Sequence, residues 1–279
     1  MQTTAARLEQ RVAKGLLWLC TGATVAVMVF IVAFIFYHGL PQLRLSFLVQ
    51  GPVRMGKEGG IFPFIIATIY ITGIAILVAT PLGVGTAIYL TEYTRPTRVT
   101  ALIRFGADCL AGVPSIIFGL FGFVFFVIRL RLGWSVLSGG LTLALMVLPT
   151  VIRTSEEAIR AVPRSYRDVA FGLGSTRWQM VTTVILPSAL PGILTGIILS
   201  VGRSVSETAA VMLTAGSSLA TPVSPLQPGR SLAYHFYILA REGISTANAY
   251  KTAAVLIISI LIINLLAYWL MQRFIAKLS

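Results

Sequence analysis

The sequence contains few charged residues, and acidic residues are especially scarce. Only 11% of the 279 residues are charged, and aspartate and glutamate together number 9. A soluble globular domain carries roughly 25% charge, whereas this chain is 56% hydrophobic with a mean hydropathy of +0.87. These values exclude a soluble protein and predict an integral membrane protein, whose length suits one membrane domain.

Cysteine and histidine are also rare, which argues against metal or disulfide chemistry. Cys20 and Cys109 lie in apolar segments without metal-ligand spacing, so we expect them to be small buried hydrophobic side chains. His38 and His235 are far apart and have no candidate ligands beside them, which favours structural or surface roles.

Motifs for ATP hydrolysis and for common catalytic centres are missing from the sequence. The chain has no G-x-x-x-x-G-K-[ST] segment and no zincin, nucleophile-elbow or kinase motif. We therefore expect a protein that is not an enzyme and binds no cofactor itself. The net charge of +13 does not indicate nucleic-acid binding, because the basic residues lie at the ends of apolar segments, as membrane-topology signals do.

The apolar segments predict an all-α protein with six transmembrane helices. The expected spans are residues 15–37, 61–80 with a helical pattern reaching Leu90, 106–128, 135–152, 189–213 and 252–272. The third contains Gly112 and Pro114, which are tolerated only where neighbouring helices satisfy the freed backbone groups. Residues 1–60 are expected to hold a basic tail, the first helix and an external loop, and residues 61–275 the main membrane domain.

Lysine and arginine are more numerous in the segments that share one side with the N-terminus. This bias predicts that both termini and the polar stretch 163–187 are cytoplasmic. The loop 214–251 is then external, and segment 231–242 within it is a candidate amphipathic helix at the outer membrane surface.

The polar stretch 163–187 has the features of two short helices joined by a turn. One apolar face recurs at helical spacing, and Gly174 followed by Ser175 or Thr176 predicts a helix end and a new cap; the face comprises Tyr166, Val169, Ala170 and Leu173. Arg164 and Asp168 are four residues apart, a spacing that permits a weak ion pair. The periodicity fits equally a helix lying on lipid headgroups and a helix that docks a soluble partner.

The spacing within this stretch resembles a known signature. Asp168-Val-Ala-x3-Gly174-x9-Val184-x-Leu186-Pro187 is similar to the E-A-A-x3-G-x9-I-x-L-P signature of ABC importer permeases, with conservative changes at three positions. The resemblance implies a coupling loop, residues 160–187, that docks into a groove of a separate ATPase subunit. It assigns this contact to Arg164, Tyr166, Asp168, Ala170, Gly174, Leu186 and Pro187.

A pair of charged residues lies in the fifth expected span. Arg203 and Glu207 would be one helical turn apart, and a charge at mid-membrane costs about 2.5–3.5 kcal/mol, so both should face the bundle interior or a water-filled path. They either form an internal ion pair that fixes packing or meet an anion in transit. Phosphate retains a proton near neutral pH and can donate a hydrogen bond to a carboxylate, whereas sulfate cannot. Ser204 and Thr208 complete this candidate substrate pathway.

Four segments resemble phosphate-specific ABC importer permeases, the PstA type more than its PstC sister. They are Gly202-Arg-x-x-x-Glu-Thr-Ala, Pro81–Tyr93, Ala111–Gly122 and Leu148–Pro163, and the likeness covers residues 61–275. It implies a heterodimer with a PstC-type permease, two copies of a PstB-type ATPase that holds ATP and Mg, and an external PstS-type phosphate-binding protein. The implied function is ATP-driven import of inorganic phosphate across the cell inner membrane.

Two alternatives stay open on the residues alone. One is a permease for another oxyanion, such as molybdate or sulfate. The other is an ATPase-independent channel or secondary transporter, in which Arg203 and Glu207 form a proton or ion relay and the coupling loop is dispensable. An intramembrane enzyme would need further catalytic residues converging at that depth, and no spacing provides them.

Overall fold

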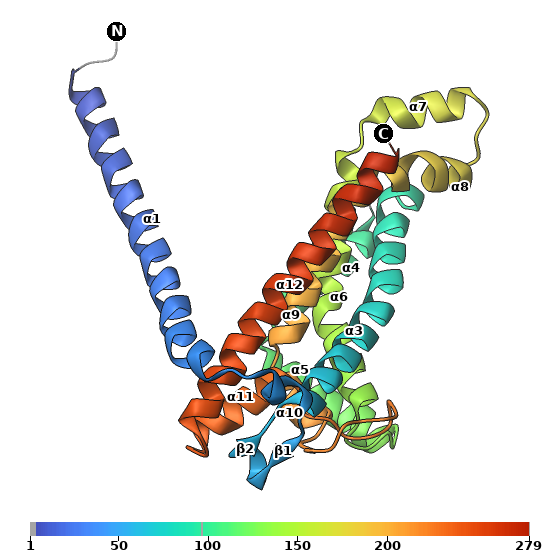
Figure 1. The fold of residues 1–279 in the computed structure, drawn as a ribbon. Helices are drawn as coiled ribbons and strands as arrows, with labels where there is room; N and C mark the ends of the chain where they lie inside the picture. Colours follow the sequence, from blue (N-terminus) through green and yellow to red (C-terminus); the bar gives the residue numbers. More distant parts are fainter. Residues whose placement is uncertain (1–3, 96, 279) are drawn as a thin grey trace.

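The computed structural model describes residues 4–95 and 97–278, and it is helical apart from one short β-hairpin (Figure 1). The hairpin pairs β1 (Pro52–Val53) antiparallel with β2 (Glu58–Gly59). The helices are α1 Thr4–Gly39, α2 Leu45–Val49, α3 Phe62–Ile88, α4 Arg98–Ala111, α5 Ser115–Gly122, α6 Val136–Ala161, α7 Arg164–Gly172, α8 Arg177–Met180, α9 Leu186–Ser206, α10 Ala209–Thr214, α11 Leu232–Arg241 and α12 Thr246–Leu278. Three π-helical segments extend them at Tyr89–Tyr93, Phe123–Arg129 and Val181–Ile185.

The all-α membrane architecture agrees with the prediction, but the expected third span is not one helix. Among the described residues, five helical segments are long and apolar enough to cross a membrane, and a bent pair makes a sixth if it counts as one span. That pair is Arg98–Ala111 and Ser115–Arg129, bent by 103°. Pro114 lacks an N–H and disfavours helical backbone at Val113, so the helix expected over 106–128 breaks there.

Two other helices are longer than the sequence pattern predicted. α3 and its π-helical extension run from Phe62 to Tyr93 with Pro81 inside the helix, so the pattern reaching Leu90 is confirmed. α6 continues to Ala161 through the segment 154–157, where the sequence allowed either continuation or a restart. Both helices therefore reach the same end of the molecule as α7.

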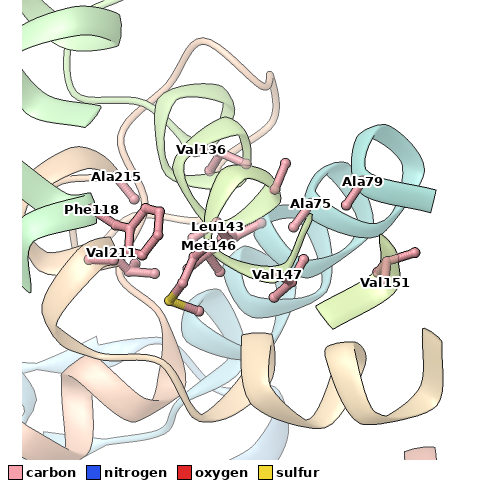
Figure 2. Close-up of a cluster of buried hydrophobic side chains, with 13 residues drawn as sticks. Ala75, Ala79, Phe118, Val136, Leu143, Met146, Val147, Val151, Val211 and Ala215 are labelled. Atoms are coloured by element: carbon pink, nitrogen blue, oxygen red, sulfur yellow. The ribbon is translucent and has the colours of Figure 1, made fainter. Parts of the chain in front are cut away.

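The core lies where α3, α5, α6 and α10 meet (Figure 2). Small residues let these helices approach closely: a Cβ added at Gly83 of α3 would lie 2.7 Å from Cγ1 of Val151 on α6. Ala75 and Ala79 of α3 face Leu143 and Val147 of α6 in the same cluster. Close backbone approach through small residues is the usual way in which membrane helices gain packing energy.

The two ends of the molecule have different contents (Figure 1). α7 and α8 lie at one end together with the beginning of α1 and the end of α12, whereas the β-hairpin and α11 lie at the other. α1 stands apart from the bundle along most of its length, and none of its most apolar stretch is buried against the rest of the chain. Cys20 on α1 and Cys109 on α4 are both exposed, so the expectation that they are buried was wrong. They lie on helices whose apolar sides are left for lipid or another chain.

The helix expected at 231–242 exists as α11, but it is not merely a surface helix. Leu232, His235 and Leu239 are buried against α3 and α12. The Thr68 hydroxyl of α3 accepts a hydrogen bond from the Leu232 N–H at 2.8 Å, which fixes the beginning of α11 on α3.

Candidate functional site

The polar stretch 163–187 forms a helix-turn-helix. Pro163 precedes α7, and Gly174 adopts φ +80°, a left-handed conformation that ends the first helix. Thr176 then begins α8 with a capping box: its hydroxyl accepts from the Gln179 N–H at 3.3 Å, and its own N–H donates to Gln179 Oε1 at 2.9 Å. The predicted end at Gly174 and new cap at Thr176 are confirmed.

α7 buries only a small part of its apolar surface. Ala170 is 4% exposed and packs in a cluster with Met180 and Ile185. The rest of the predicted apolar face points away from the protein, since Val169 is 62% exposed and Leu173 is 81% exposed. Further exposed apolar side chains surround them: Tyr166, Phe171 and Trp178. A contiguous exposed apolar surface of this kind marks a site that binds another protein or a membrane.

The charges on α7 are arranged differently from the prediction. Arg164 and Asp168 are both exposed, and the described residues include no ion pair between them. Arg167 instead pairs with Glu92, with Nη2 2.7 Å from Oε1. Sequence reasoning missed this pair, although Glu92 is the one acidic residue in the basic segment 91–105.

The end of the signature lies away from the exposed face of α7. Leu186 and Pro187 begin α9, and both are half-buried. They line an apolar hollow of about 760 Å³ between α3 and α9. The structure therefore separates the predicted coupling residues into a group on α7 and its turn, which is exposed except for Ala170, and a half-buried group at the start of α9.

The candidate substrate pathway lies at a break between two helices. The single helix expected over 189–213 is wrong, because α9 ends at Ser206 and Glu207 is extended (φ −72°, ψ 132°) before α10 begins at Ala209. Oε1 of Glu207 accepts hydrogen bonds from the N–H groups of Ala209 (3.0 Å) and Ala210 (3.3 Å). These bonds satisfy the free donors at the beginning of α10 and compensate for the interruption.

Arg203 and Glu207 do not form the internal ion pair considered above. Arg203 is exposed in the last turn of α9, and its guanidinium has no hydrogen bond or ion pair within the part of the chain that the structure describes. Ser204 is instead buried with an unpartnered Oγ, and Thr208 is half-buried at the start of α10. The Arg203 guanidinium is therefore free to meet a ligand, and the Glu207 carboxylate is fixed by the N–H groups of Ala209 and Ala210.

Arg230 and His235 are buried together at the opposite end; the structural role expected for His235 agrees with this, but sequence reasoning missed Arg230. Arg230 is 5% exposed and donates from Nη2 to Ser217 Oγ at 2.8 Å, while its Nη1 lies 3.3 Å from Nδ1 of His235. Burial, and to a lesser extent the nearby Arg230 charge, together lower the pKa of His235 to about 3. His235 is thus neutral, and it stacks on Phe64 of α3 with ring centroids 3.8 Å apart.

Residues 79–279 match the family described as the binding-protein-dependent transport system inner membrane component. The chain belongs to this family. It is 34% identical to the probable ABC transporter permease protein YqgI of Bacillus subtilis over 98% of both chains. It is 31% identical to the phosphate transport system permease protein PstA of Pasteurella multocida, over 91% of this chain and 88% of the relative.

The fold of this permease is also that of a solved ABC importer. A chain of the bacterial alginate ABC transporter, in complex with an alginate pentasaccharide-bound periplasmic protein, superimposes with a TM-score of 0.66 at 14% identity. The match covers 96% of this chain and 98% of that one, and at this identity it shows the fold alone. The protein is thus an inner-membrane, multi-pass permease component, and its named relatives are permease subunits.

Proposed function

We infer that this permease imports inorganic phosphate, driven by ATP hydrolysis on a separate subunit. The observation that carries the substrate assignment is the free guanidinium of Arg203 near the α9–α10 break, four residues before Glu207, whose carboxylate is fixed. A guanidinium binds phosphate oxygens through paired donors. A phosphate that retains a proton can also donate to Glu207, which a fully ionised sulfate cannot do. The PstA relatives support the same substrate.

The exposed surface of α7 is the proposed docking site for a PstB-type ATPase. The ATPase subunit would bind ATP and Mg, because this chain has no P-loop sequence. The position of α7 and α8 at the end where α1 begins and α12 ends supports cytoplasmic termini, because the positive-inside bias assigns the same side to all of them.

A second permease of the PstC type is the proposed partner within the membrane. Large apolar side chains on α1 and α5 are exposed, including Phe30, Ile117 and Phe121, and lipid or a related subunit must cover them. Arg203 would then lie between the two permeases, with an external PstS-type protein delivering phosphate.

Replacing Arg203 tests the substrate pathway. We expect Arg203→Ala to insert, assemble with its partners and lose ATP-driven phosphate uptake, because the side chain is exposed and its guanidinium makes no hydrogen bond or ion pair within the described residues. Arg203→Lys keeps the charge without the paired donors and should retain partial uptake. Uptake is measured with labelled phosphate in proteoliposomes that contain the complete complex. Near-normal uptake by Arg203→Ala would refute the pathway role.

A further inference from the structure

The end of α3 is held by the helix-turn-helix through a buried ion pair. The Glu92 carboxylate receives hydrogen bonds from Arg167 Nη2 at 2.7 Å and from Arg167 Nε at 3.1 Å. The Glu92 side chain is 6% exposed and the Arg167 side chain 19%, so water has little access to the contact. A guanidinium bound to a carboxylate through two nitrogens has a fixed relative orientation. This contact therefore joins α7 rigidly to α3.

The same arginine and a second one extend the contact to four helices, α3, α6, α7 and α8. Arg167 also donates from Nη2 to the Ile159 carbonyl at 2.9 Å and from Nη1 to the Val162 carbonyl at 2.7 Å, at the end of α6. Arg177 of α8 donates from Nη1 to the Glu92 carbonyl at 2.9 Å. Both helices of the helix-turn-helix thus hold Glu92, and a movement of either one pulls on the end of α3.

α3 carries such a movement to the opposite end of the molecule. It is one continuous helical segment from Glu92 back to Phe62, and it packs closely on α6 and α9. Near its beginning, Phe64 stacks on His235 and Thr68 accepts the hydrogen bond from Leu232, so α3 also holds α11. In Figure 1, α3 reaches from the region of α7 and α8 to the region of α11.

The residues of α7 that would contact the ATPase differ from the residue that connects α7 to α3. Val169 and Leu173 point away from the protein, where a partner reaches them, whereas Arg167 points inward to Glu92. Glu92 itself is buried and makes no contribution to the exposed surface. A variant at Glu92 therefore leaves the proposed docking surface in place.

We propose that the Glu92–Arg167 pair is the positioning contact that converts displacement of α7 into movement of α3 and, through it, of α11. This rests on the proposed ATP-driven import. Its loss uncouples the two processes: the ATPase still docks and hydrolyses ATP, but hydrolysis no longer reorients the membrane helices.

The first test measures ATP hydrolysis and phosphate uptake in the same proteoliposomes. Glu92→Gln keeps the size of the side chain and removes its charge, and we expect about a tenfold fall in phosphate carried per ATP hydrolysed, with normal ATPase co-purification. Glu157→Gln is the matched control. Glu157 is exposed at the same end and makes only a weak ion pair, with its Oε1 3.9 Å from Arg153 Nε.

Several outcomes would overturn the proposal. A wild-type ratio of uptake to hydrolysis in Glu92→Gln refutes it, and so does loss of the ATPase from the purified Glu92→Gln complex, which would make the pair a docking or folding contact. If Glu92→Gln does not fold, Arg167→Lys replaces it, since one ammonium cannot reproduce the two-nitrogen contact. That variant must show the same reduced ratio, and an unchanged ratio refutes the proposal.

A second measurement does not depend on the transported substrate. Cys20 and Cys109, both exposed, are first replaced by serine. Spin labels on cysteines introduced at the exposed positions Ser165 of α7 and Leu82 of α3 then report the distance between the two helices by pulsed electron paramagnetic resonance. We expect one narrow distribution with and without ATP in the otherwise native protein and a broad one in Glu92→Gln. An equally narrow distribution in both proteins refutes the rigid contact. Absence of phosphate uptake by the wild-type complex would instead refute the proposed function and leave this measurement interpretable.

Discussion

Replacement of Leu173 by serine provides a quantitative test of α7 as the ATPase docking surface. The Leu173 side chain is 81% exposed in the isolated chain, so a partner that covers it removes nearly its whole apolar surface from water. Full burial of a leucine side chain contributes about 1.5–3 kcal/mol, and the exposed share of this value is about 1–2.5 kcal/mol. The ATPase should therefore bind Leu173→Ser roughly 5- to 60-fold more weakly.

The assay is a titration of purified ATPase onto the membrane subunits in nanodiscs, with the dissociation constant as the readout. Leu226→Ser is the matched control, because Leu226 is 59% exposed in the loop between α10 and α11, far along the chain from α7. Neither change should lower the unfolding temperature of the permease, since both side chains are already exposed. Binding of Leu173→Ser within twofold of wild type would refute the docking role of α7.

Three further predictions concern the stability of the permease, measured as thermal unfolding in detergent. Gly83→Ala should destabilise the permease by about 1–3 kcal/mol because the new Cβ would lie 2.7 Å from Cγ1 of Val151. Gly85→Ala should stabilise the permease by up to about 1 kcal/mol because the space around Gly85 is open. Equal effects of the two would contradict the packing described. Thr176→Ala removes the cap of α8 and should cost about 1 kcal/mol; an unchanged unfolding temperature would speak against the cap. The pKa of His235 is lowered to about 3 in the fold, so the unfolded state binds the extra proton as pH falls below 6.5. Stability should then drop by about 2 kcal/mol from pH 7 to pH 5, and a drop of the same size in His235→Gln would contradict this origin.

The sequence was sufficient for the membrane class and for the helix-turn-helix of residues 163–187. Gly174 and Thr176 are local signals, since a left-handed glycine and a capping threonine act on their own neighbours, and the structure has both at the predicted positions. The apolar runs also located most of the long helices, because length and hydropathy decide whether a segment can span a membrane, but they did not reveal the breaks within two of the expected spans.

The helix breaks and the buried polar contacts could not be predicted in the same way. Pro114 was noted as tolerated in a helix, but the angle at that break depends on how α5 packs against α6 and α10. The break at Glu207 required its side chain to bond two backbone N–H groups, which spacing alone does not reveal. The pair between Glu92 and Arg167 joins residues 75 positions apart, so only the folded structure brings it together.

Competition between oxyanions during ATP-driven uptake is the most direct test of the proposed phosphate import. The complete complex is reconstituted with its ATPase and binding protein, and labelled phosphate is followed with and without ATP and with excess unlabelled phosphate, sulfate or molybdate. We expect ATP-dependent phosphate accumulation that unlabelled phosphate suppresses and that sulfate and molybdate leave intact. Accumulation of sulfate or molybdate in place of phosphate, or phosphate flux that needs no ATP, would contradict it.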